Sequence, residues 1–312
     1  MDYALLGSSG LAVSSLGFGA AGFAGTGEYF GHIGSTGLAE AERQVGLCLD
    51  AGINLFDTSN SYSGGESERI LGQALGARRQ DVVLCTKVAV RVGGKGGPND
   101  VGLSRHNILR ACETSLRQLG TDWIDLYQLH APDALTRPDE TLRALDDLVR
   151  SGKVRYVGCS NFAGWQLMKS LSTAAAQGLE RLASHQIFYS LVCRDAEHEL
   201  VPAAIDQGLG ILVWGPLASG FLSGKFRRGE RPPEGTRIAA MPEVPKVPDW
   251  EHGHDIVDVV REIAVARGVP PSQVALNWLR RKPWVSSVLI GARNEAQLKD
   301  NLGCTAWDLS DE

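Results

Sequence analysis

The sequence lacks the features of membrane-spanning and exported chains. Its 312 residues contain no uninterrupted apolar run near the roughly 18 residues that a membrane-spanning helix needs. The first ten residues, MDYALLGSSG, have no basic stretch followed by an apolar segment, which is the pattern of an export signal. We therefore expect a cytoplasmic chain with no membrane partner.

Cysteine is sparse and never occurs as a C-x-x-C pair. The six cysteines stand singly at positions 48, 85, 112, 159, 193 and 304, which gives neither a zinc-ligand spacing nor a disulfide framework. The two histidines of EHGHD, His252 and His254, are expected to lie solvated in a polar loop. Reduced thiols and no metal site are the simplest expectation.

Long runs of a single charge sign are also missing. Lys and Arg number 31 against 36 Asp and Glu, and the formal net charge is -5. This balance lacks the basic footprint of a nucleic-acid-binding protein and favours a small molecule as the partner. No linker composition or internal repeat divides the chain, so we expect one domain over residues 1–312.

Short apolar runs alternate with longer amphipathic segments along almost the whole chain. The strand candidates are residues 16–19, 53–56, 82–86, 124–129, 154–158, 185–188, 211–214 and 286–290. Helical patterns follow them, such as 104–120, which Ser104 caps and Gly120 ends, and the segment from Pro138 to Gly152. Mostly apolar strands with crossover helices predict an α/β fold of the (β/α)8 TIM-barrel type. A doubly wound open sheet is the structural alternative.

Two segments fall outside this alternation. Residues 3–13, YALLGSSGLAV, predict a β-hairpin that could plug the underside of the barrel. Residues 220–250, after the seventh strand, are rich in proline and charge and predict a long functional loop. Within this loop KFRRGER is either a solvated charge run or a lid over cofactor phosphates.

One glycine motif has the spacing of a Rossmann fingerprint. GFGAAG, residues 17–22, fits G-x-G-x-x-G after a strand candidate. A Rossmann fold requires a helix to open on the last glycines, whereas here the sequence continues as loop until about Leu38. We therefore do not expect a Rossmann domain.

Ionisable side chains stand where the apolar strands stop. Asp57, Lys87 and His130 each follow such a strand, and Tyr62 lies in the loop after Asp57. Because the strand ends of a (β/α)8 barrel form one rim, these side chains are expected to converge. Asp57 and Lys87 can compensate each other as an ion pair. An ammonium beside Tyr62 would stabilise its anion and make the phenol a tuned proton donor.

A set of motifs taken together resembles one family, the aldo-keto reductases. The motifs are AGINLFDTSNSYSGGESERILGQAL, LCTKV, DWIDLYQLH, GKVRYVGCSNF, HQIFYSL, WGPLASGFLSGKF and VLIGARNEAQLKDN, and they cover nearly the whole chain in the family's order. The resemblance implies a TIM barrel that binds an extended nicotinamide dinucleotide and reduces carbonyls by hydride transfer. It also implies a catalytic tetrad of Asp57, Tyr62, Lys87 and His130.

The resemblance assigns a role to each member of the tetrad. Tyr62 protonates the developing alkoxide, and Lys87, oriented by Asp57, lowers the pKa of Tyr62. His130 positions the carbonyl by hydrogen bonding. These roles agree with the convergence that the strand ends predict.

The cofactor contacts implied by the resemblance are spread over the same rim. Ser160, Asn161 and Gln186 match the positions that hold the carboxamide, and Trp214 matches the aromatic residue under the nicotinamide. The remaining expected contacts are Gly19, Ala20, Gly215, Pro216, Leu217, Gly220, Lys225, Gly291, Arg293, Gln297 and Asn301. A guanidinium suits a phosphate, so Arg293 is the expected partner of a 2'-phosphate, which favours NADP(H) over NAD(H).

The expected function is that of a reductase that reversibly converts an aldehyde or ketone into the alcohol. The alternative is a cofactor-bound regulatory or redox-sensing subunit of a membrane channel with little turnover. AWDLSDE stops where members usually continue into a last helix and tail, so we expect either an open pocket or a short chain. The sequence does not indicate the substrate, the preferred direction or the oligomeric state.

Overall fold

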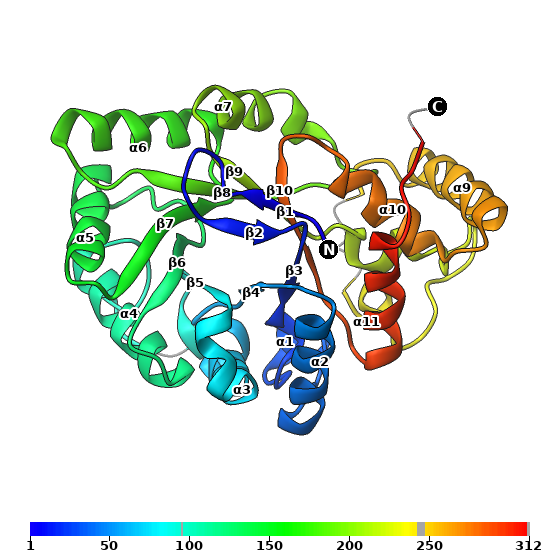
Figure 1. Ribbon diagram of the computed structural model, residues 1–312, viewed down its shortest axis with the longest axis horizontal. Coiled ribbons are helices and arrows are strands. Elements are labelled where there is room, and N and C mark those ends of the chain that lie inside the picture. The colour runs from blue at the N-terminus through cyan, green and yellow to red at the C-terminus, as the bar shows by residue number, and fades with distance from the viewer. Residues whose placement is uncertain (95, 242–246, 311–312) are drawn as a thin grey trace.

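The computed structural model describes residues 1–94, 96–241 and 247–310. Parallel strands close into a barrel in the order β10-β3-β4-β5-β6-β7-β8-β9, and β9 pairs with β10 (Figure 1). The barrel strands are β3 (Leu16–Gly19), β4 (Leu55–Asp57), β5 (Val83–Val88), β6 (Ile124–Leu129), β7 (Val154–Ser160), β8 (Leu182–Phe188), β9 (Gly210–Trp214) and β10 (Val285–Ile290). The predicted TIM barrel is confirmed, and the open-sheet alternative is wrong.

Helices surround the barrel in the alternating order that the sequence predicts (Figure 1). They are α2 (Leu38–Asp50), α3 (Glu66–Leu75), α4 (Arg105–Leu119), α5 (Pro138–Arg150), α6 (Gly164–Gln177), α7 (Leu200–Asp206), α9 (Trp250–Arg267), α10 (Pro271–Arg280) and α11 (Glu295–Leu302), with the four-residue helices α1 (Glu28–Gly31) and α8 (Arg237–Ala240). Single 3-10 turns add η1 (Ala20–Gly22), η2 (Tyr62–Gly65), η3 (Gly76–Asp81), η4 (Val92–Gly94), η5 (Asp195–Glu197), η6 (Ala218–Ser223) and η7 (Gly303–Thr305). Among the helices that the structure describes, none has both the length and the apolar character needed to cross a bilayer.

Local signals set the ends of the long helices. Ser104 caps α4 by accepting a hydrogen bond from the N–H of Asn107 at 3.3 Å, and Gly120 ends the helix with φ +63°. Pro138 is the first residue of α5, where its missing N–H costs no hydrogen bond. Both helices therefore begin and end where the sequence predicts.

The N-terminal segment forms the predicted hairpin from β1 (Tyr3–Leu5) and β2 (Ala12–Ser14), which pair antiparallel. It lies against the amino ends of the barrel strands, because the N–H of Ser14 donates to Asn54 Oδ1 at 2.7 Å, just before β4. At Gly7, which has φ +61°, a Cβ would come within 2.3 Å of the Gly208 carbonyl oxygen. Only glycine fits this close approach to the segment before β9.

The hairpin closes the interior of the barrel at this end. Leu6 and Val13 are fully buried. They pack with inward-facing side chains of the strands, which are Leu55, Val83, Cys85, Leu126, Leu212 and Leu289. The carboxyl ends of the strands, at the opposite mouth, are left to form the site.

The long segment after β9 is only partly loop. It contains η6 and α8, and α9 begins at Trp250, so EHGHD lies in the first turns of a helix and not in a polar loop. His254 is 6% exposed, and its ring centroid lies 5.1 Å from that of Phe221. The prediction of a solvated His254 is wrong, because α9 turns this ring toward the small core under the loop. Residues 242–246 lie outside the described part of the chain.

Candidate active site

The four side chains of the predicted tetrad meet at the open mouth of the barrel. Asp57 is the last residue of β4, Lys87 lies in β5, and His130 directly follows β6. Tyr62 opens the turn η2, which begins five residues after Asp57. The site is thus assembled from three neighbouring strands, as expected for side chains on one barrel rim.

Lys87 is the centre of this group. Its fully buried ammonium lies 2.5 Å from Asp57 Oδ1 and donates to the Thr58 carbonyl oxygen at 2.9 Å. It also lies 3.3 Å from the Tyr62 hydroxyl oxygen. An ammonium has three protons, and each has an acceptor here, so Nζ is fixed in position and stays charged. Burial disfavours the charge and is the largest single effect, but Asp57, with smaller contributions from Tyr62 and Cys85, outweighs it and the pKa of Lys87 is raised.

The phenol of Tyr62 is held neutral. Burial raises the pKa of Tyr62 above its usual range, and the positive charge of Lys87 lowers it by a smaller amount. Lys87 therefore lowers the pKa of Tyr62 as expected, although the net pKa is raised. Desolvation of the phenolate is the larger effect, and it keeps the proton on the oxygen.

His130 is also neutral. Burial, reinforced by the nearby charge of Lys87, lowers the pKa of His130 to about 3. Its Nδ1 lies 3.0 Å from the hydroxyl oxygen of Ser59, and its ring stands edge-on to Tyr62 with centroids 5.6 Å apart. Because Ser59 engages Nδ1, the other ring nitrogen is the one that can meet a ligand.

The predicted carboxamide contacts belong to the same hydrogen-bond network. Asn161, with φ +60°, donates from Nδ2 to the His130 carbonyl oxygen at 2.9 Å and to Ser160 Oγ at 3.0 Å. Trp214 Nε1 donates to Asn161 Oδ1 at 3.0 Å. Gln186 Nε2 donates to the second oxygen of Asp57 at 2.9 Å. Hydrogen bonds therefore connect the tetrad with the residues that are predicted to hold the nicotinamide.

The predicted glycine contacts line the rim beside this network. Gly19 ends β3 and Gly291 follows β10, and a Cβ on Gly291 would lie 3.6 Å from the Gly19 carbonyl oxygen. On the other side Gly215, Pro216 and Leu217 lead from β9 into η6. Gly220 has φ +91°, and a Cβ there would come within 3.3 Å of Lys225 Nζ. Ala20 opens η1, directly after Gly19.

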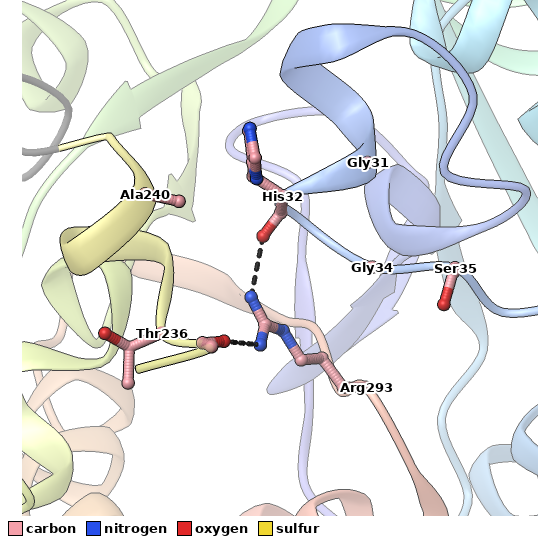
Figure 2. Close-up of a pocket in the computed structure, with 8 residues that line it drawn as sticks. Gly31, His32, Gly34, Ser35, Thr236, Ala240 and Arg293 are labelled. Atoms are coloured by element: carbon pink, nitrogen blue, oxygen red, sulfur yellow. Dashed lines mark hydrogen bonds between the residues drawn. The ribbon is translucent and has the colours of Figure 1, made fainter. Parts of the chain in front are cut away.

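Arg293 lies at a cavity of about 280 Å3 (Figure 2). Its guanidinium donates to the carbonyl oxygens of His32 at 2.6 Å, Ile33 at 3.2 Å and Gly235 at 2.6 Å. The cavity is lined by Gly31, His32, Gly34, Ser35, Gly235, Thr236, Ala240 and Arg293. Arg293 thus joins the loop before α2 to the loop before α8, and two of its five N–H protons are not used in these bonds.

The two remaining predicted contacts support the segment that carries Arg293. Gln297 Oε1 accepts a hydrogen bond from the backbone N–H of Arg293 at 3.0 Å. Asn301 Nδ2 donates to the Gly291 carbonyl oxygen at 3.3 Å. In this structure both side chains on α11 therefore hold the turn after β10 in place.

Sequence reasoning missed Arg237 on α8. This side chain is half-buried, and within the described residues its Nε has no hydrogen-bond partner. Burial and the charge of Arg293 lower the pKa of Arg237, and both arginines contribute to lowering that of Lys225. None of the three cations forms an ion pair in residues 1–94, 96–241 and 247–310. A cluster of three unpaired cations attracts phosphate groups. Nothing in the sequence around Arg237 distinguishes it from the other charged residues of its loop.

Two residues of the charge run KFRRGER, Lys225 and Arg228, have different surroundings. Arg228 forms ion pairs with Glu251 and Asp255 of α9, which fasten this part of the loop to the helix. Lys225 instead lies against Gly220 at the rim. Sequence reasoning also missed Ser59 and Phe30, although the Phe30 ring packs at a tilt against Tyr62 with centroids 5.5 Å apart. In the described part of the chain no three His, Cys, Asp or Glu side chains gather as a metal site.

The chain is similar to several known proteins over most of its length. The sequence is 38% identical to an uncharacterized oxidoreductase of Bacillus subtilis, over 100% of this chain and 93% of that protein. It is 35% identical to a probable voltage-gated potassium channel subunit beta of Arabidopsis thaliana, over 97% of this chain and 90% of the relative. It is 34% identical to versiconal hemiacetal acetate reductase of Aspergillus parasiticus, over 91% and 86%.

A family model agrees with these relatives over nearly the whole barrel. The model of the aldo/keto reductase family matches residues 15–312, which leaves only the hairpin outside the match. The matched region contains every residue of the tetrad network. The chain therefore belongs to the aldo/keto reductase family.

Proposed function

We propose that this protein is an NADP(H)-dependent reductase that reversibly converts an aldehyde or ketone into the alcohol, with Tyr62 as the proton donor. The observation that carries the proposal is the contact between Lys87 Nζ and the Tyr62 oxygen at 3.3 Å, with Asp57 behind it at 2.5 Å. A neutral phenol backed by a fixed ammonium is suited to give a proton and to hold the resulting charge.

The residues at the mouth fit a nicotinamide dinucleotide. Members of the family generally use NAD(P)H, which when bound supplies the hydride. Ser160, Asn161 and Trp214 would hold the nicotinamide end, since they form a fixed polar and aromatic surface beside His130. Lys225 and Arg237 would hold phosphate, because they are cations without a carboxylate partner among the described residues.

The chain's own groups account for the proton transfer. Tyr62 gives its proton to the carbonyl oxygen, and the Lys87 ammonium stabilises the phenolate that remains. Asp57, held by Gln186 through its second oxygen, keeps Lys87 aimed at that phenolate. Neutral His130 can hydrogen-bond to the substrate oxygen without competing as an acid. In alcohol oxidation the same groups act in reverse.

NADP(H) is the preferred dinucleotide in this proposal. Arg293 lies at the cavity between the loop before α2 and the loop before α8, and two of its N–H protons are not used in its contacts with the backbone. Arg237 is close enough for its charge to act on Arg293 and Lys225. Positive charges gathered without acids favour the ligand that carries the additional phosphate.

A channel-associated binding role is the second candidate. Relatives named as probable voltage-gated potassium channel subunits beta, from Arabidopsis thaliana and Oryza sativa, each match 97% of this chain. Such a role would need tight dinucleotide binding but little turnover. The intact network from Asp57 to Tyr62 favours the enzyme.

Turnover of purified protein tests the proposal. With NADPH and a panel of aldehydes and ketones, absorbance at the dihydronicotinamide band reports the rate. Tyr62→Phe keeps the ring but removes the proton, and we expect it to lower kcat by about 10²–10⁴-fold. NADPH affinity, measured by fluorescence quenching, is expected to stay unchanged. Absence of wild-type turnover with tight NADPH binding would favour the channel-associated role, and full activity of Tyr62→Phe would remove Tyr62 from the mechanism.

A further inference from the structure

The first turn of α3 contacts residues at or near the ends of β3, β4 and β5, and two of these strands, β4 and β5, carry Asp57 and Lys87. Ser67 is fully buried, and its hydroxyl donates to the Ala20 carbonyl oxygen, just after β3, at 2.7 Å. The same hydroxyl lies 2.9 Å from Thr58 Oγ1. Since its one proton is given to Ala20, it accepts the proton of Thr58. Thr58 follows Asp57 and its carbonyl oxygen is an acceptor for Lys87.

The next residue, Glu68, performs the equivalent role at β5. It is fully buried, and Thr86 Oγ1 donates to its Oε1 at 2.6 Å. Thr86 directly precedes Lys87 in the strand. Two consecutive residues of one helix therefore contact the neighbours of both Asp57 and Lys87, although neither of the two touches the ion pair itself.

We propose that Ser67 and Glu68 are positioning residues of this site, which hold the ends of β3, β4 and β5 in register so that Lys87 reaches Tyr62. This inference rests on the proposed function. The distances to be maintained are short, since Lys87 Nζ must satisfy Asp57, Thr58 and Tyr62 at once. A small shift between β4 and β5 would break at least one of these three contacts.

Glu68 also carries a charge that can act on the site. Burial raises the pKa of Glu68 to about 7, against the opposing effects of the Thr86 and Ser115 hydroxyls and of Lys87. The titratable groups facing it are Lys87 on β5, Cys112 on α4 and Tyr127 on β6. Within the described chain, Glu68 Oε2 and the hydroxyls of Ser115 and Tyr127 have no hydrogen-bond partner of good geometry. Lys87 is therefore the charged group with which Glu68 interacts.

The two residues are tested by near-isosteric variants. Glu68→Gln keeps an acceptor for Thr86 but loses the charge, and Ser67→Ala loses both hydroxyl contacts. We expect Ser67→Ala to lower kcat by about 10-fold or more with little change in KM for the carbonyl. Arg69→Ala, at an exposed position of the same helix, is the matched control and is expected to leave kcat unchanged.

The pH profile separates positioning from simple loss of stability. In the wild type, ionisation of Glu68 as pH rises through about 7 partly neutralises the Lys87 charge that supports Tyr62 when it loses its proton. We therefore expect kcat for reduction to fall across this range and Glu68→Gln to lose the step. Thr86→Val is expected to behave like Ser67→Ala, and Thr86→Ser, which restores the hydroxyl, is expected to recover activity.

A measurement independent of activity separates this inference from the proposed function. In protein carrying 13Cζ-labelled tyrosine, the Tyr62 resonance is the one missing from Tyr62→Phe, and it reports the contact with Lys87. We expect it to move in Ser67→Ala and Glu68→Gln but not in Arg69→Ala. Unmoved resonances with wild-type kinetics would overturn the positioning role. Shifted resonances in a protein without turnover would overturn only the proposed function.

Discussion

Burial disfavours the charged form of both basic side chains of this site, and the partner of each one decides whether the charge is kept. Lys87 and His130 are both removed from water, yet Lys87 stays charged because the Asp57 carboxylate lies 2.5 Å away. His130 has a neutral hydroxyl as its partner and a cation nearby, so the pKa of His130 falls to about 3. The site thus combines one ion pair, between Lys87 and Asp57, with two neutral groups, Tyr62 and His130, that can exchange hydrogen bonds.

His185 on β8 is desolvated in the same way. It is fully buried, and burial lowers the pKa of His185 to about 4. Between that value and the ordinary value near 6.5 the unfolded chain binds the proton and the folded chain does not. The free energy of unfolding therefore falls as pH is lowered through this range, by about 1.4 kcal/mol per pH unit.

We expect His185→Leu to remove this dependence. Lowering the pH from 7 to 5 should reduce the free energy of unfolding of the wild type by about 2 kcal/mol more than that of the variant. Urea unfolding at the two pH values measures it. His106→Leu, at an exposed position of α4, is the control. Equal pH slopes for wild type and His185→Leu would show that the buried imidazole is protonated in the folded state.

Sequence reasoning singled out Asp57, Lys87 and His130 because they follow apolar strands, where a buried charge is conspicuous. Tyr62 was noted in the loop after Asp57, and the resemblance to the aldo-keto reductases implied the catalytic roles of all four. Ser59 and Arg237 lack such a signal. Ser59 is one of several serines in its loop, and it matters only because the fold brings it to His130 Nδ1. The net rise in the pKa of Tyr62 was also beyond the sequence, because it depends on how much water the folded rim excludes.

The hairpin is the element whose contribution to stability can be separated most cleanly from the site. Leu6 is fully buried in the barrel floor, whereas Leu5 beside it is 57% exposed. Leu6→Ala is expected to lower the free energy of unfolding by about 2–5 kcal/mol, the usual range for a buried leucine. Leu5→Ala should change it by no more than about 0.5 kcal/mol. Urea unfolding measures both, and similar losses in the two variants would show that the floor is not packed as described.

Helix ends were predictable where the chain supplies chemical signals for them. The bounds of α4 follow from the Ser104 hydroxyl and Gly120, and those of α5 from Pro138. By contrast α1 and α8 are four residues long, too short for a periodic pattern. The start of α9 was missed because the glycine and histidines of EHGHD are typical of loops, although Asp249 caps this helix through the N–H of His252.

Whole-molecule organisation is most visible at Arg293, which joins parts of the chain that are far apart in sequence. Its guanidinium contacts carbonyl groups near residue 32 and at residue 235, and its backbone follows β10 (Figure 2). Under the proposed function Arg293 both connects these loops and binds the additional phosphate of NADP(H), which gives it two separable effects. The first depends on the loops alone, and the second depends on which dinucleotide is bound.

We expect Arg293→Ala to weaken NADPH binding by about 10-fold or more relative to NADH, because a charge-assisted contact to the additional phosphate is lost. Fluorescence titration of both dinucleotides measures the ratio. Arg228→Ala is the control, because it removes a cation of the segment between β9 and α9 that is already paired with carboxylates of α9. Equal weakening of both dinucleotides by Arg293→Ala would leave Arg293 with the loop-joining role only.

The overall architecture was predictable because each unit of the barrel repeats the same local requirement, an apolar strand that a helix covers on the outside. Eight such units leave few ways to arrange a parallel sheet, and closure pairs β10 with β3. The contacts between distant loops, such as Arg293 with His32, have no counterpart in this local pattern. They depend on the closed ring itself.

Leu6 and Val13 fill the floor of the barrel, so in the part of the chain that the structure describes the open mouth at the carboxyl ends of the strands is the route to the tetrad. Under the proposed function, a dinucleotide and a carbonyl compound both enter through this mouth. The ligand that binds deeper in the barrel must therefore bind first and dissociate last. The architecture therefore favours an ordered binding mechanism. Product-inhibition kinetics are expected to show a compulsory order of binding, in which the ligand that binds deeper is released last in each catalytic cycle.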